Sequence, residues 1–372
     1  MSSVLIAVTA AGGKTGQAVV RELRSRNLAV RALVRGRDAR SEALARLGAE
    51  VVEADLFDTA SMTRALSGAH RAYYCPPLHP ETGRTLDAFL VAAEANRLEA
   101  VAGMSQWLAS PNHPTRMTRD MWAVEQRLAK LPGAAVTILN PGFFADNYLR
   151  VTIGMAAQLG LYPNFVGDSR NAPPSNDDMA RVIAGVLADP DRFAGRRMRI
   201  TGPALVSVDE ITAALSTVLG RKVRPLAAPE WLLNKVAAFR GEPRYDMAVF
   251  RHYLVDHRQG AFEFGGATDV VQEVSGRPAE SLETTVRAYA TRPEARRTGA
   301  AFRKVFGEFM LAPLWRGYDH AAYERAHGLA PPAGSLYAMQ DEAWKADHAT
   351  SSEHDTSAIA KIDNARAVRR SA

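Results

Sequence analysis

The chain has only one cysteine, Cys75, in 372 residues. A single cysteine cannot form an intramolecular disulfide, so a small secreted domain held together by disulfides is excluded. No apolar run approaches the roughly 20 residues that a membrane-spanning helix needs. The apolar stretch Val4–Val8 is too short for a secretory signal and has no cleavage site after it. We therefore expect a cytoplasmic protein without a membrane partner.

Two further classes lack support in the sequence. The 9 histidines show no spacing typical of a metal site, because His252 and His257 are five residues apart and no His-Glu-x-x-His motif occurs. Lysine and arginine exceed the acidic residues by 46 to 40, but they are scattered and form no basic block. We therefore expect no metal and no nucleic acid partner. A diffuse basic surface is instead typical of solvation, and it can aid the capture of an anionic cofactor.

Short β-branched runs alternate with helical patterns over roughly the first 140 residues. The expected strands are Val4–Val8, Ala29–Val34, Val51–Glu53, Arg71–Tyr74, Ala100–Met104 and Val136–Leu139. The expected helices between them are Thr15–Arg24, Ser61–Leu66, Thr82–Asn96 and Thr118–Leu131. This alternation predicts βαβ units whose right-handed crossovers place helices on both faces. The expected fold class is α/β, a doubly wound parallel Rossmann sheet that binds ligands at the carboxyl ends of its strands.

The pattern loosens after Asn147. Here we expect a helix over Ser175–Ala188 with Asn176 as its cap, a strand over Met198–Thr201, and a helix that Ser207 and Glu210 begin as a capping box. Two more helices are expected over Pro229–Arg240 and Ser281–Ala290. Residues 1–155 plus 175–205 should then form the Rossmann domain. Residues 156–174 plus 206–292 should form a smaller, mainly helical substrate lobe.

A C-terminal helical extension is expected over residues 293–345. Phe302, Val305, Phe306 and Phe309 recur at helical spacing, and a helix with such a stripe must bury it somewhere. Two places can receive it, the region between the lobes and a second subunit, and we favour a homodimer through this extension. Residues 346–372 are polar and poor in aromatics, so we expect a disordered tail.

The stretch TAAGGKTG, from Thr9 to Gly16, follows the first expected strand directly. A P-loop would need a glycine at position 8, which is Val8, so an ATP or GTP site is disfavoured. Gly13 and Gly16 have the spacing of the second and third glycines of a dinucleotide-binding turn, and the helix after them would point its N–H groups at a pyrophosphate. The first glycine is replaced by Ala10 or Ala11, which a tight turn accepts if φ stays negative.

The end of the second expected strand indicates which dinucleotide binds. An NAD enzyme presents Asp or Glu there to the ribose 2′-hydroxyl, whereas this chain has Arg35. A guanidinium can bind a 2′-phosphate through two parallel hydrogen bonds, and Lys14 would add charge. The sequence therefore favours NADP, with NADPH preferred over NADH, although Arg35 could also be a solvated residue at the strand end.

Several motifs in this order and spacing resemble the NmrA-like proteins, which are atypical relatives of the short-chain dehydrogenases. They are TAAGGKTGQAVV, RALVRGR, VVEADLFD, ILNPGFFADN, SNDDMARVIAGVLADPDRFAGRRMRITGP and LVSVDEITAALSTVLGRKV, and they cover roughly residues 4–290. The resemblance implies an NAD(P)-binding Rossmann fold. It implies either an oxidoreductase or a cofactor-sensing regulator, because the family contains both.

The resemblance also implies which residues contact the cofactor. The matching regions are the glycine turn, the residues after the third strand that hold the adenine, and the ends of the fourth, fifth and sixth strands beside the nicotinamide. They correspond to Thr9, Ala10, Gly13, Lys14, Thr15, Gly16, Asp55, Leu56, Cys75, Pro76, Ser105, Pro141 and Phe143. Arg35, taken from the end of the second strand, completes the expected cofactor contacts. Trp107, Phe143 and Phe144 are expected to line the substrate opening.

The proton donor typical of short-chain dehydrogenases is missing. These enzymes use a Tyr-x-x-x-Lys pair, and no tyrosine in this chain has lysine four residues later. Ser105, at the end of the fifth strand, and Tyr148 are the candidate catalytic residues, although a loop cap and a packed aromatic are the alternatives. We expect an NADP-dependent oxidoreductase that passes hydride to a small apolar or aromatic acceptor (a quinone, an enone or a carbonyl). The alternative is a non-catalytic NADP(H)-sensing regulator that acts through a protein partner.

Overall fold

A computed structural model describes residues 4–349 and 353–355. It contains an eight-stranded sheet in the order β10-β8-β6-β5-β4-β1-β2-β3. Every pairing in this sheet is parallel except that of β10 with β8. The strands span Leu5–Val8 (β1), Ala29–Val34 (β2), Glu50–Glu53 (β3), Arg71–Tyr74 (β4), Ala100–Met104 (β5), Ala135–Leu139 (β6), Arg196–Met198 (β8) and Glu353–Asp355 (β10). The expected doubly wound parallel sheet is confirmed.

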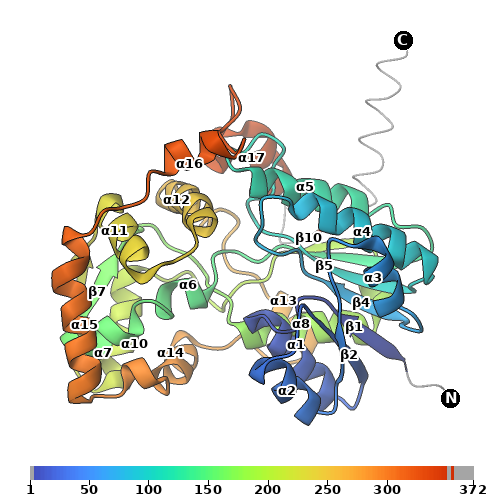
Figure 1. Ribbon diagram of the computed structural model, residues 1–372, viewed down its shortest axis with the longest axis horizontal. Helices are drawn as coiled ribbons and strands as arrows, with labels where there is room; N and C mark the ends of the chain where they lie inside the picture. The colour runs from blue at the N-terminus through green and yellow to red at the C-terminus, as the bar shows by residue number, and fades with distance from the viewer. Residues whose placement is uncertain (1–3, 350–352, 356–372) are drawn as a thin grey trace.

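Helices cover both faces of this sheet (Figure 1). One face carries α1 (Lys14–Ser25), α8 (Asn176–Ala188) and α13 (Val270–Ser275), and the other carries α3 (Thr59–Ala65), α4 (Thr82–Ala95) and α5 (Arg116–Leu128). Side chains of a strand alternate between the two faces, so Tyr73 belongs to the core under α1 and α8 while Tyr74 packs on Phe89 of α4. Helix α2 (Ala39–Arg46) follows β2 and begins with a capping box at Asp38. The short α9 (Pro190–Phe193) leads into β8.

The strand order places β1 between β4 and β2, so the chain reverses its winding direction between β1 and β4. Ligands of doubly wound sheets bind at the carboxyl ends of the strands beside such a reversal. The glycine turn after β1 and Cys75 after β4 lie at this point. The Cys75 backbone N–H donates to Oγ1 of Thr9 at 2.8 Å, which joins the two loops.

The second lobe has its own apolar core and a two-stranded sheet, β7 (Leu161–Asn164) paired in parallel with β9 (Arg224–Ala227). Its helices are α6 (Ala145–Leu149), α7 (Ile153–Leu159), α10 (Val208–Leu219), α11 (Glu230–Arg240), α12 (Arg244–Arg258) and α14 (Leu282–Ala290). Ser207 and Glu210 form the expected capping box of α10, and Gly220 ends this helix in the left-handed conformation.

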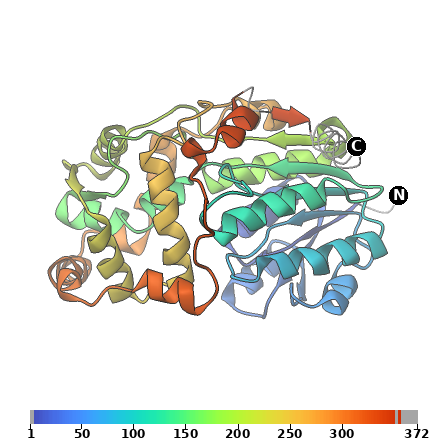
Figure 2. The same ribbon diagram turned by 90° about the horizontal axis from the view of Figure 1, so that it is seen from above.

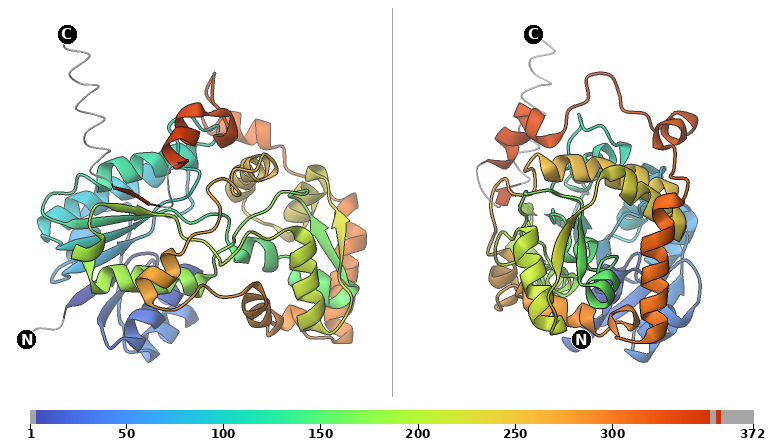
Figure 3. Two further views of the ribbon diagram at one scale, coloured as in Figure 1. Left: turned by 180° about the vertical axis from the view of Figure 1, so that it is seen from behind. Right: turned by 90° about the vertical axis from the view of Figure 1, so that its left-hand side faces the viewer.

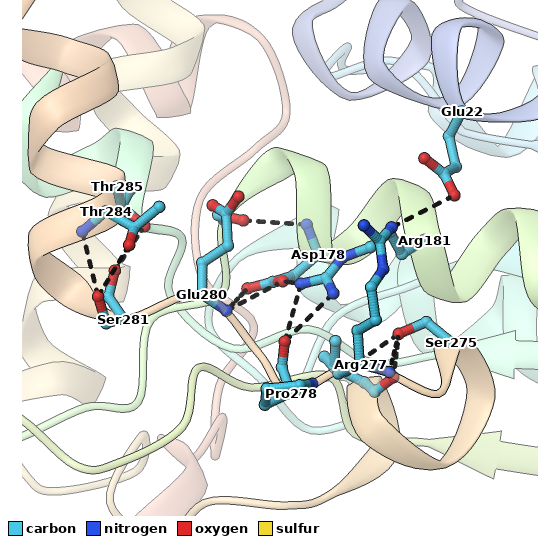
Figure 4. Close-up of polar contacts among 12 residues, drawn as sticks. Glu22, Asp178, Arg181, Ser275, Arg277, Pro278, Glu280, Ser281, Thr284 and Thr285 are labelled. Atoms are coloured by element: carbon cyan, nitrogen blue, oxygen red, sulfur yellow. Dashed lines mark hydrogen bonds and ion pairs between the residues drawn. The ribbon is translucent and has the colours of Figure 1, made fainter. Parts of the chain in front are cut away.

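The segment from α13 to α14 passes from the sheet domain to the second lobe, and α8 fixes its course (Figure 4). Asp178, which is fully buried, pairs with Arg181 and accepts the backbone N–H of Glu280 at 3.0 Å. Arg181 donates to the carbonyl of Pro278 at 3.2 Å. Ser281 then caps α14 by accepting the N–H of Thr284. These hydrogen bonds hold the start of α14 at a defined place between the lobes.

The C-terminal extension wraps both lobes. It comprises η1 (Pro293–Ala295), α15 (Gly299–Leu311), η2 (Ala312–Leu314), α16 (His320–Ala326), η3 (Ala338–Gln340) and α17 (Glu342–His348). Helix α15 packs on α7, and α16 packs on α12. Figure 2 shows the following segment running along the junction of the lobes to α17, beside the sheet. Because α17 and β10 continue beyond residue 346, regular structure extends into the expected tail, whose remaining residues 350–352 and 356–372 lie outside the described part.

Three expectations need correction. Ser175, not Asn176, caps α8, because its hydroxyl accepts the N–H of Asp178 at 2.9 Å. Ala10 has φ of +49°, not the negative φ expected, so the turn uses the left-handed conformation in spite of its Cβ. The strand expected over 198–201 lies instead over Arg196–Met198.

In the part of the chain that the structure describes, no helix combines the length and apolar character needed to cross a membrane.

Candidate active site

The glycine turn is held from both sides and leaves the start of α1 open. Thr9 N–H donates to Tyr73 of β4 at 3.0 Å, and Ala11 N–H donates to Leu33 of β2 at 3.1 Å. The N-cap of α1 is Gly13, which supplies no side-chain hydrogen bond, and the first turn contains no acidic residue. The N–H groups of this turn are therefore free of side-chain partners, as an anion-binding helix terminus requires.

The glycines of this turn have different structural roles. A Cβ at Gly16 would lie 2.4 Å from the carbonyl oxygen of Ala10, so Gly16 allows α1 to pack against the turn. A Cβ at Gly12 would meet no atom within 4 Å, and one at Gly13 would meet only the Ala10 oxygen, at 3.1 Å. Gly12 and Gly13 thus keep the space above the turn clear, which fits the close approach of a pyrophosphate to the backbone.

Arg35 directly follows β2 and is exposed. Among the described residues it has no ion-pair partner, whereas Arg37 lies 3.5 Å from Glu53. Arg40 also approaches the turn, with Nη1 at 3.5 Å from the Gly12 carbonyl oxygen. The guanidinium of Arg35 is therefore available to a phosphate. Asp55 is exposed after β3, where its Oδ1 accepts the N–H of Phe57 at 2.9 Å, and Leu56 is half-buried.

A buried polar cluster joins the ends of β5, β6 and β8. Oγ of Ser105 donates to Oε1 of Glu125 at 2.5 Å, and Nδ2 of Asn140 donates to the same oxygen at 2.6 Å. Nε of Arg197 lies 3.2 Å from Oε2 of Glu125. Burial raises the pKa of Glu125, and the Arg197 guanidinium opposes part of that rise. In this arrangement the Ser105 hydroxyl donates its hydrogen to Glu125 and is not available to protonate a substrate.

Two polar atoms of this region lack partners among the described residues. They are Nε2 of Gln106 and Oδ1 of Asn140, and both are buried. The other atoms of these amides are engaged, since Oε1 of Gln106 accepts from Tyr253 and Nδ2 of Asn140 also donates to the Gln106 carbonyl at 3.0 Å. An unused donor and an unused acceptor at adjacent strand ends fit a ligand with complementary groups.

Lys14 connects the glycine turn to α6. Its Nζ lies 2.5 Å from Oδ2 of Asp146, whose other oxygen accepts the Tyr289 hydroxyl hydrogen at 2.5 Å. Arg150 and Arg292 approach the same carboxylate at 3.4 and 3.6 Å. Burial tends to raise the pKa of Asp146, but the hydrogen bonds from Lys14 and Tyr289 hold it below its usual value.

The second candidate catalytic residue, Tyr148, lies in a buried aromatic cluster. Its hydroxyl bonds Nε2 of His257, and Nδ1 of His257 lies 2.5 Å from the hydroxyl of Ser169. Burial raises the pKa of Tyr148 and lowers that of His257 to about 4. The ring of Phe143 packs on Tyr148 and His257, with centroids 5.1 and 5.3 Å apart. Tyr148 is thus surrounded by protein in this structure.

The expected lining residues differ in their surroundings. Phe143 and Trp107 are buried, whereas Phe144 is only half-buried. Trp107 donates from Nε1 to the Ala261 carbonyl at 2.9 Å, and the Arg199 guanidinium lies over its ring at 3.8 Å. Trp344 of α17 packs edge-on against it at 5.8 Å. The extension therefore covers Trp107.

The remaining expected residues lie after β4, after β6 and in the first turn of α1. Cys75 and Pro76 follow β4, Pro141 accepts the N–H of Trp107 at 3.0 Å, and Thr15 donates from Oγ1 to Asn176 at 2.9 Å. Burial raises the pKa of the Cys75 thiol, which does not favour a nucleophile. His113, just before α5, is fully buried, with Nε2 at 2.8 Å from Asp256. The described residues contain no group of three or more His, Cys, Asp or Glu that could hold a metal ion.

Several site residues escaped the sequence analysis, namely Asp146, Arg197, His257 and Tyr289. Three of their main contacts span more than 70 residues of sequence: Arg197 with Glu125, His257 with Tyr148, and Tyr289 with Asp146. Asp146 and Arg197 stand in quoted motifs, and the acidic side chain of Asp146 beside the aromatic pair was one available signal.

Comparisons with known proteins find relatives that are named as nucleotide-dependent reductases. The profile of the NmrA-like family matches residues 2–93. The chain is 27% identical over 286 residues to an NAD(P)H azoreductase of Xenophilus azovorans, covering 77% of this chain and 98% of that protein. It is also 27% identical over 224 residues to quinone oxidoreductase 2 of Escherichia coli strain K12, covering 59% and 76%.

Solved structures share the fold. An NADPH-dependent quinone oxidoreductase of Escherichia coli, solved with NADPH, matches with a TM-score of 0.64 and 24% identity, covering 76% of this chain and 99% of that one. A triphenylmethane reductase of Citrobacter sp. matches with a TM-score of 0.67 and 20% identity, covering 77% and 99%. The resemblance stated from the motifs is thereby supported: the profile of the NmrA-like family matches residues 2–93, and a similar protein is named an NmrA-like family domain-containing oxidoreductase.

Proposed function

We propose that the chain is an NAD(P)H-dependent oxidoreductase that passes hydride to a flat, apolar acceptor, a quinone above all. The observation that carries the proposal is the open N-terminus of α1 at the winding reversal of the sheet. Gly13 caps this helix without a side-chain bond, and the space above Gly12 is free. Relatives named as an azoreductase and a quinone oxidoreductase support the same reaction type.

The residues at the carboxyl ends of the strands fit NADP. The turn N–H groups of α1 would hold the pyrophosphate, and Arg35 would bind the 2′-phosphate. Asp55 and Leu56 would lie beside the adenine, and Cys75, Pro76, Pro141 and Phe143 beside the nicotinamide end. When bound, the reduced cofactor supplies the hydride. Because Arg35 is exposed and free of an ion-pair partner among the described residues, we further propose a preference for NADPH over NADH.

The acceptor class follows from the missing proton donor. The Ser105 hydroxyl is hydrogen-bonded to Glu125, and the Tyr148 hydroxyl is hydrogen-bonded to His257. Burial also raises the pKa of Tyr148, so this hydroxyl is a weaker acid than usual. A quinone needs a hydride and one proton to become a hydroquinone, and solvent water can supply that proton. A ketone or aldehyde depends more on a positioned acid. The half-buried Phe144 is the expected aromatic residue best placed to contact a flat ring.

In this proposal Ser105 and its partners have a positioning role. Glu125 holds the Ser105 hydroxyl and the Asn140 amide, and Arg197 compensates the buried carboxylate. Asn140 then presents Oδ1, and Gln106 presents Nε2, without partners among the described residues. This donor and acceptor would hydrogen-bond the carboxamide of the nicotinamide or an acceptor oxygen.

The test is steady-state oxidation of NADPH by the full chain with a panel of quinones, azo dyes, enones and simple ketones. We expect turnover with quinones, weaker turnover with NADH, and little with ketones. A Gly13→Val variant serves as the control for oxidation outside the site. NADPH binding without turnover of any acceptor would contradict the proposal that the chain is an oxidoreductase. That result would favour the cofactor-sensing regulator. Such a regulator needs no proton donor, and the hydroxyls of Ser105 and Tyr148 are already hydrogen-bonded to Glu125 and His257.

A further inference from the structure

Helix α15 and the turn after it expose an unusual number of large apolar side chains. They form a continuous stretch that we call the apolar ridge: Phe302, Phe306, Phe309, Met310, Leu311, Leu314 and Trp315. Leu314 is 81% exposed. Exposed apolar groups of this size, gathered on one segment, are typical of a surface that binds a partner.

The ridge faces outward because the other side of α15 is occupied. Val305 lies over Gly154 of α7, and Glu308 pairs with Arg240 of α11 at 2.8 Å. Phe302 and Phe306 stand one turn apart on the free side, with stacked rings 5.7 Å between centroids. The right-hand view of Figure 3 shows α15 lying along the outside of the second lobe, in front of the other helices.

Cations flank the apolar ridge. Between residues 296 and 316 the chain has five basic residues and one acid, Glu308. Glu308 is neutralised by Arg240. The five basic side chains are all exposed and have no ion-pair partner among residues 4–349 and 353–355; they are Arg296, Arg297, Arg303, Lys304 and Arg316. The segment from residue 296 to 316 therefore carries a net positive charge.

We propose that the apolar ridge binds the surface of an anionic lipid bilayer. Phe302, Phe306, Phe309 and Met310 share one side of α15, and Leu314 and Trp315 follow in η2 and directly after it. Apolar and aromatic side chains with Arg and Lys beside them are the composition of helices that lie in a membrane interface. Such binding needs no membrane-spanning helix, so it is compatible with the absence of long apolar runs, but it departs from the expectation that the protein has no membrane partner. Each basic residue near an anionic surface contributes about 1 kcal/mol to binding.

A second copy of the chain fits these charges less well. A two-fold dimer brings the same patch of both subunits together. The uncompensated cations of one ridge would then lie near those of the other, which costs free energy, whereas acidic lipid headgroups neutralise them. The homodimer expected from the sequence stays a prediction, and it is the alternative that the experiment must separate.

The experiment is sedimentation of the full chain with vesicles, without cofactor or acceptor, so its result does not depend on the proposed reaction. One set of vesicles contains only phosphatidylcholine, and the other contains about one third phosphatidylglycerol. We expect binding to the anionic vesicles that weakens as salt is added. The double variants Phe302→Ser/Phe306→Ser and Arg303→Glu/Lys304→Glu should each bind about tenfold or more weakly.

The matched control is Val91→Ser, which changes an apolar side chain of similar exposure on α4 of the sheet domain and should bind as the parent does. Thermal unfolding verifies that every variant is folded. Absence of binding to anionic vesicles at low salt, or equal binding by parent and ridge variants, overturns the proposal. Light scattering measures the molar mass of the parent and of the Phe302→Ser/Phe306→Ser variant in solution. A parent dimer that becomes monomeric in this variant identifies a second copy of the chain as the partner, and this result also overturns the membrane proposal.

Discussion

Nζ of Lys14, in the first turn of α1, lies 2.5 Å from Oδ2 of Asp146 in α6. The ion pair links the glycine turn to the segment that follows β6. The Asp146 carboxylate also accepts the hydroxyl hydrogen of Tyr289. The depressed pKa of Asp146 means that its contribution to stability is present above the pKa of the unfolded chain, near 3.9, and is lost as the pH falls through the lower folded value.

Asp146→Asn should therefore lower the free energy of unfolding at pH 7 by about 1–3 kcal/mol, since two donors lose a charged acceptor. At an acid pH below the folded pKa of Asp146, the difference between parent and variant should shrink, because Asp146 is then protonated in the parent as well. Urea denaturation at both pH values measures this. Asp177→Asn, which removes an exposed pair with Arg21, should change stability by about 0–1 kcal/mol. Equal effects of the two substitutions at pH 7 would contradict the role given to Asp146.

Arg35→Ala should weaken NADPH binding by about 1–3 kcal/mol and leave NADH binding nearly unchanged, because only NADPH carries the 2′-phosphate. Calorimetric titration with both nucleotides gives the two affinities. Arg37→Ala is the matched control, since Arg37 is turned toward Glu53 and should matter little for either nucleotide. A parent protein that binds NADPH and NADH equally would refute the assignment of Arg35.

The buried His257 should make the protein less stable in acid. Its pKa of about 4 lies below the value near 6.5 of an unfolded histidine, so the unfolded chain binds more protons between these pH values. Stability should thus be full above about pH 6.5 and fall as the pH drops toward 4. His252, whose pKa is also lowered to about 4 by burial, should add to the same slope.

His257→Gln should be less stable than the parent at pH 7, and its stability should fall less steeply between pH 6.5 and 4, by up to about 1.4 kcal/mol per pH unit. Unfolding free energies across that range test this, with the exposed His327→Gln as the control. Identical slopes for the parent and His257→Gln would show that His257 does not titrate as its burial requires.

Trp344→Ala should destabilise the protein by about 3–5 kcal/mol, as expected for removing a buried tryptophan. Trp344 packs on Trp107 and stacks on His348 at 4.2 Å, so its loss would uncover the end of β5. Trp231→Ala removes an exposed tryptophan and should cost far less. If both variants unfold at the parent's urea concentration, the extension is a passive tail.

The strands of the sheet were predictable because their apolar runs are short, β-branched and bounded by turn residues. Ala29–Val34, Arg71–Tyr74 and Ala100–Met104 have the expected bounds. Helix α12 and the pair β7–β9 had no such signal, since Arg244–Arg258 contains many charged residues and β9 contains Pro225. Their structure depends on packing within the second lobe, which local propensity does not encode.

The candidate site was predictable where one short segment forms it. The glycine turn and Arg35 belong to consecutive elements, so spacing alone identified them. Glu125 lies in α5, and its partner Arg197 is 72 residues away in β8. A buried ion pair of this kind leaves no periodic pattern in the sequence, which is why the polar cluster at Ser105 emerged only from the fold.

The central claim is that the glycine turn binds NADPH, and one calorimetric titration tests it most directly. The parent and Gly13→Val are titrated with NADPH under the same conditions, together with Gly12→Val, whose Cβ would meet no protein atom within 4 Å. We predict saturable binding by the parent, and no binding by either variant at the parent's saturating concentration, with unfolding temperatures close to that of the parent. A folded variant that binds NADPH as tightly as the parent would show that the cofactor does not lie on this turn.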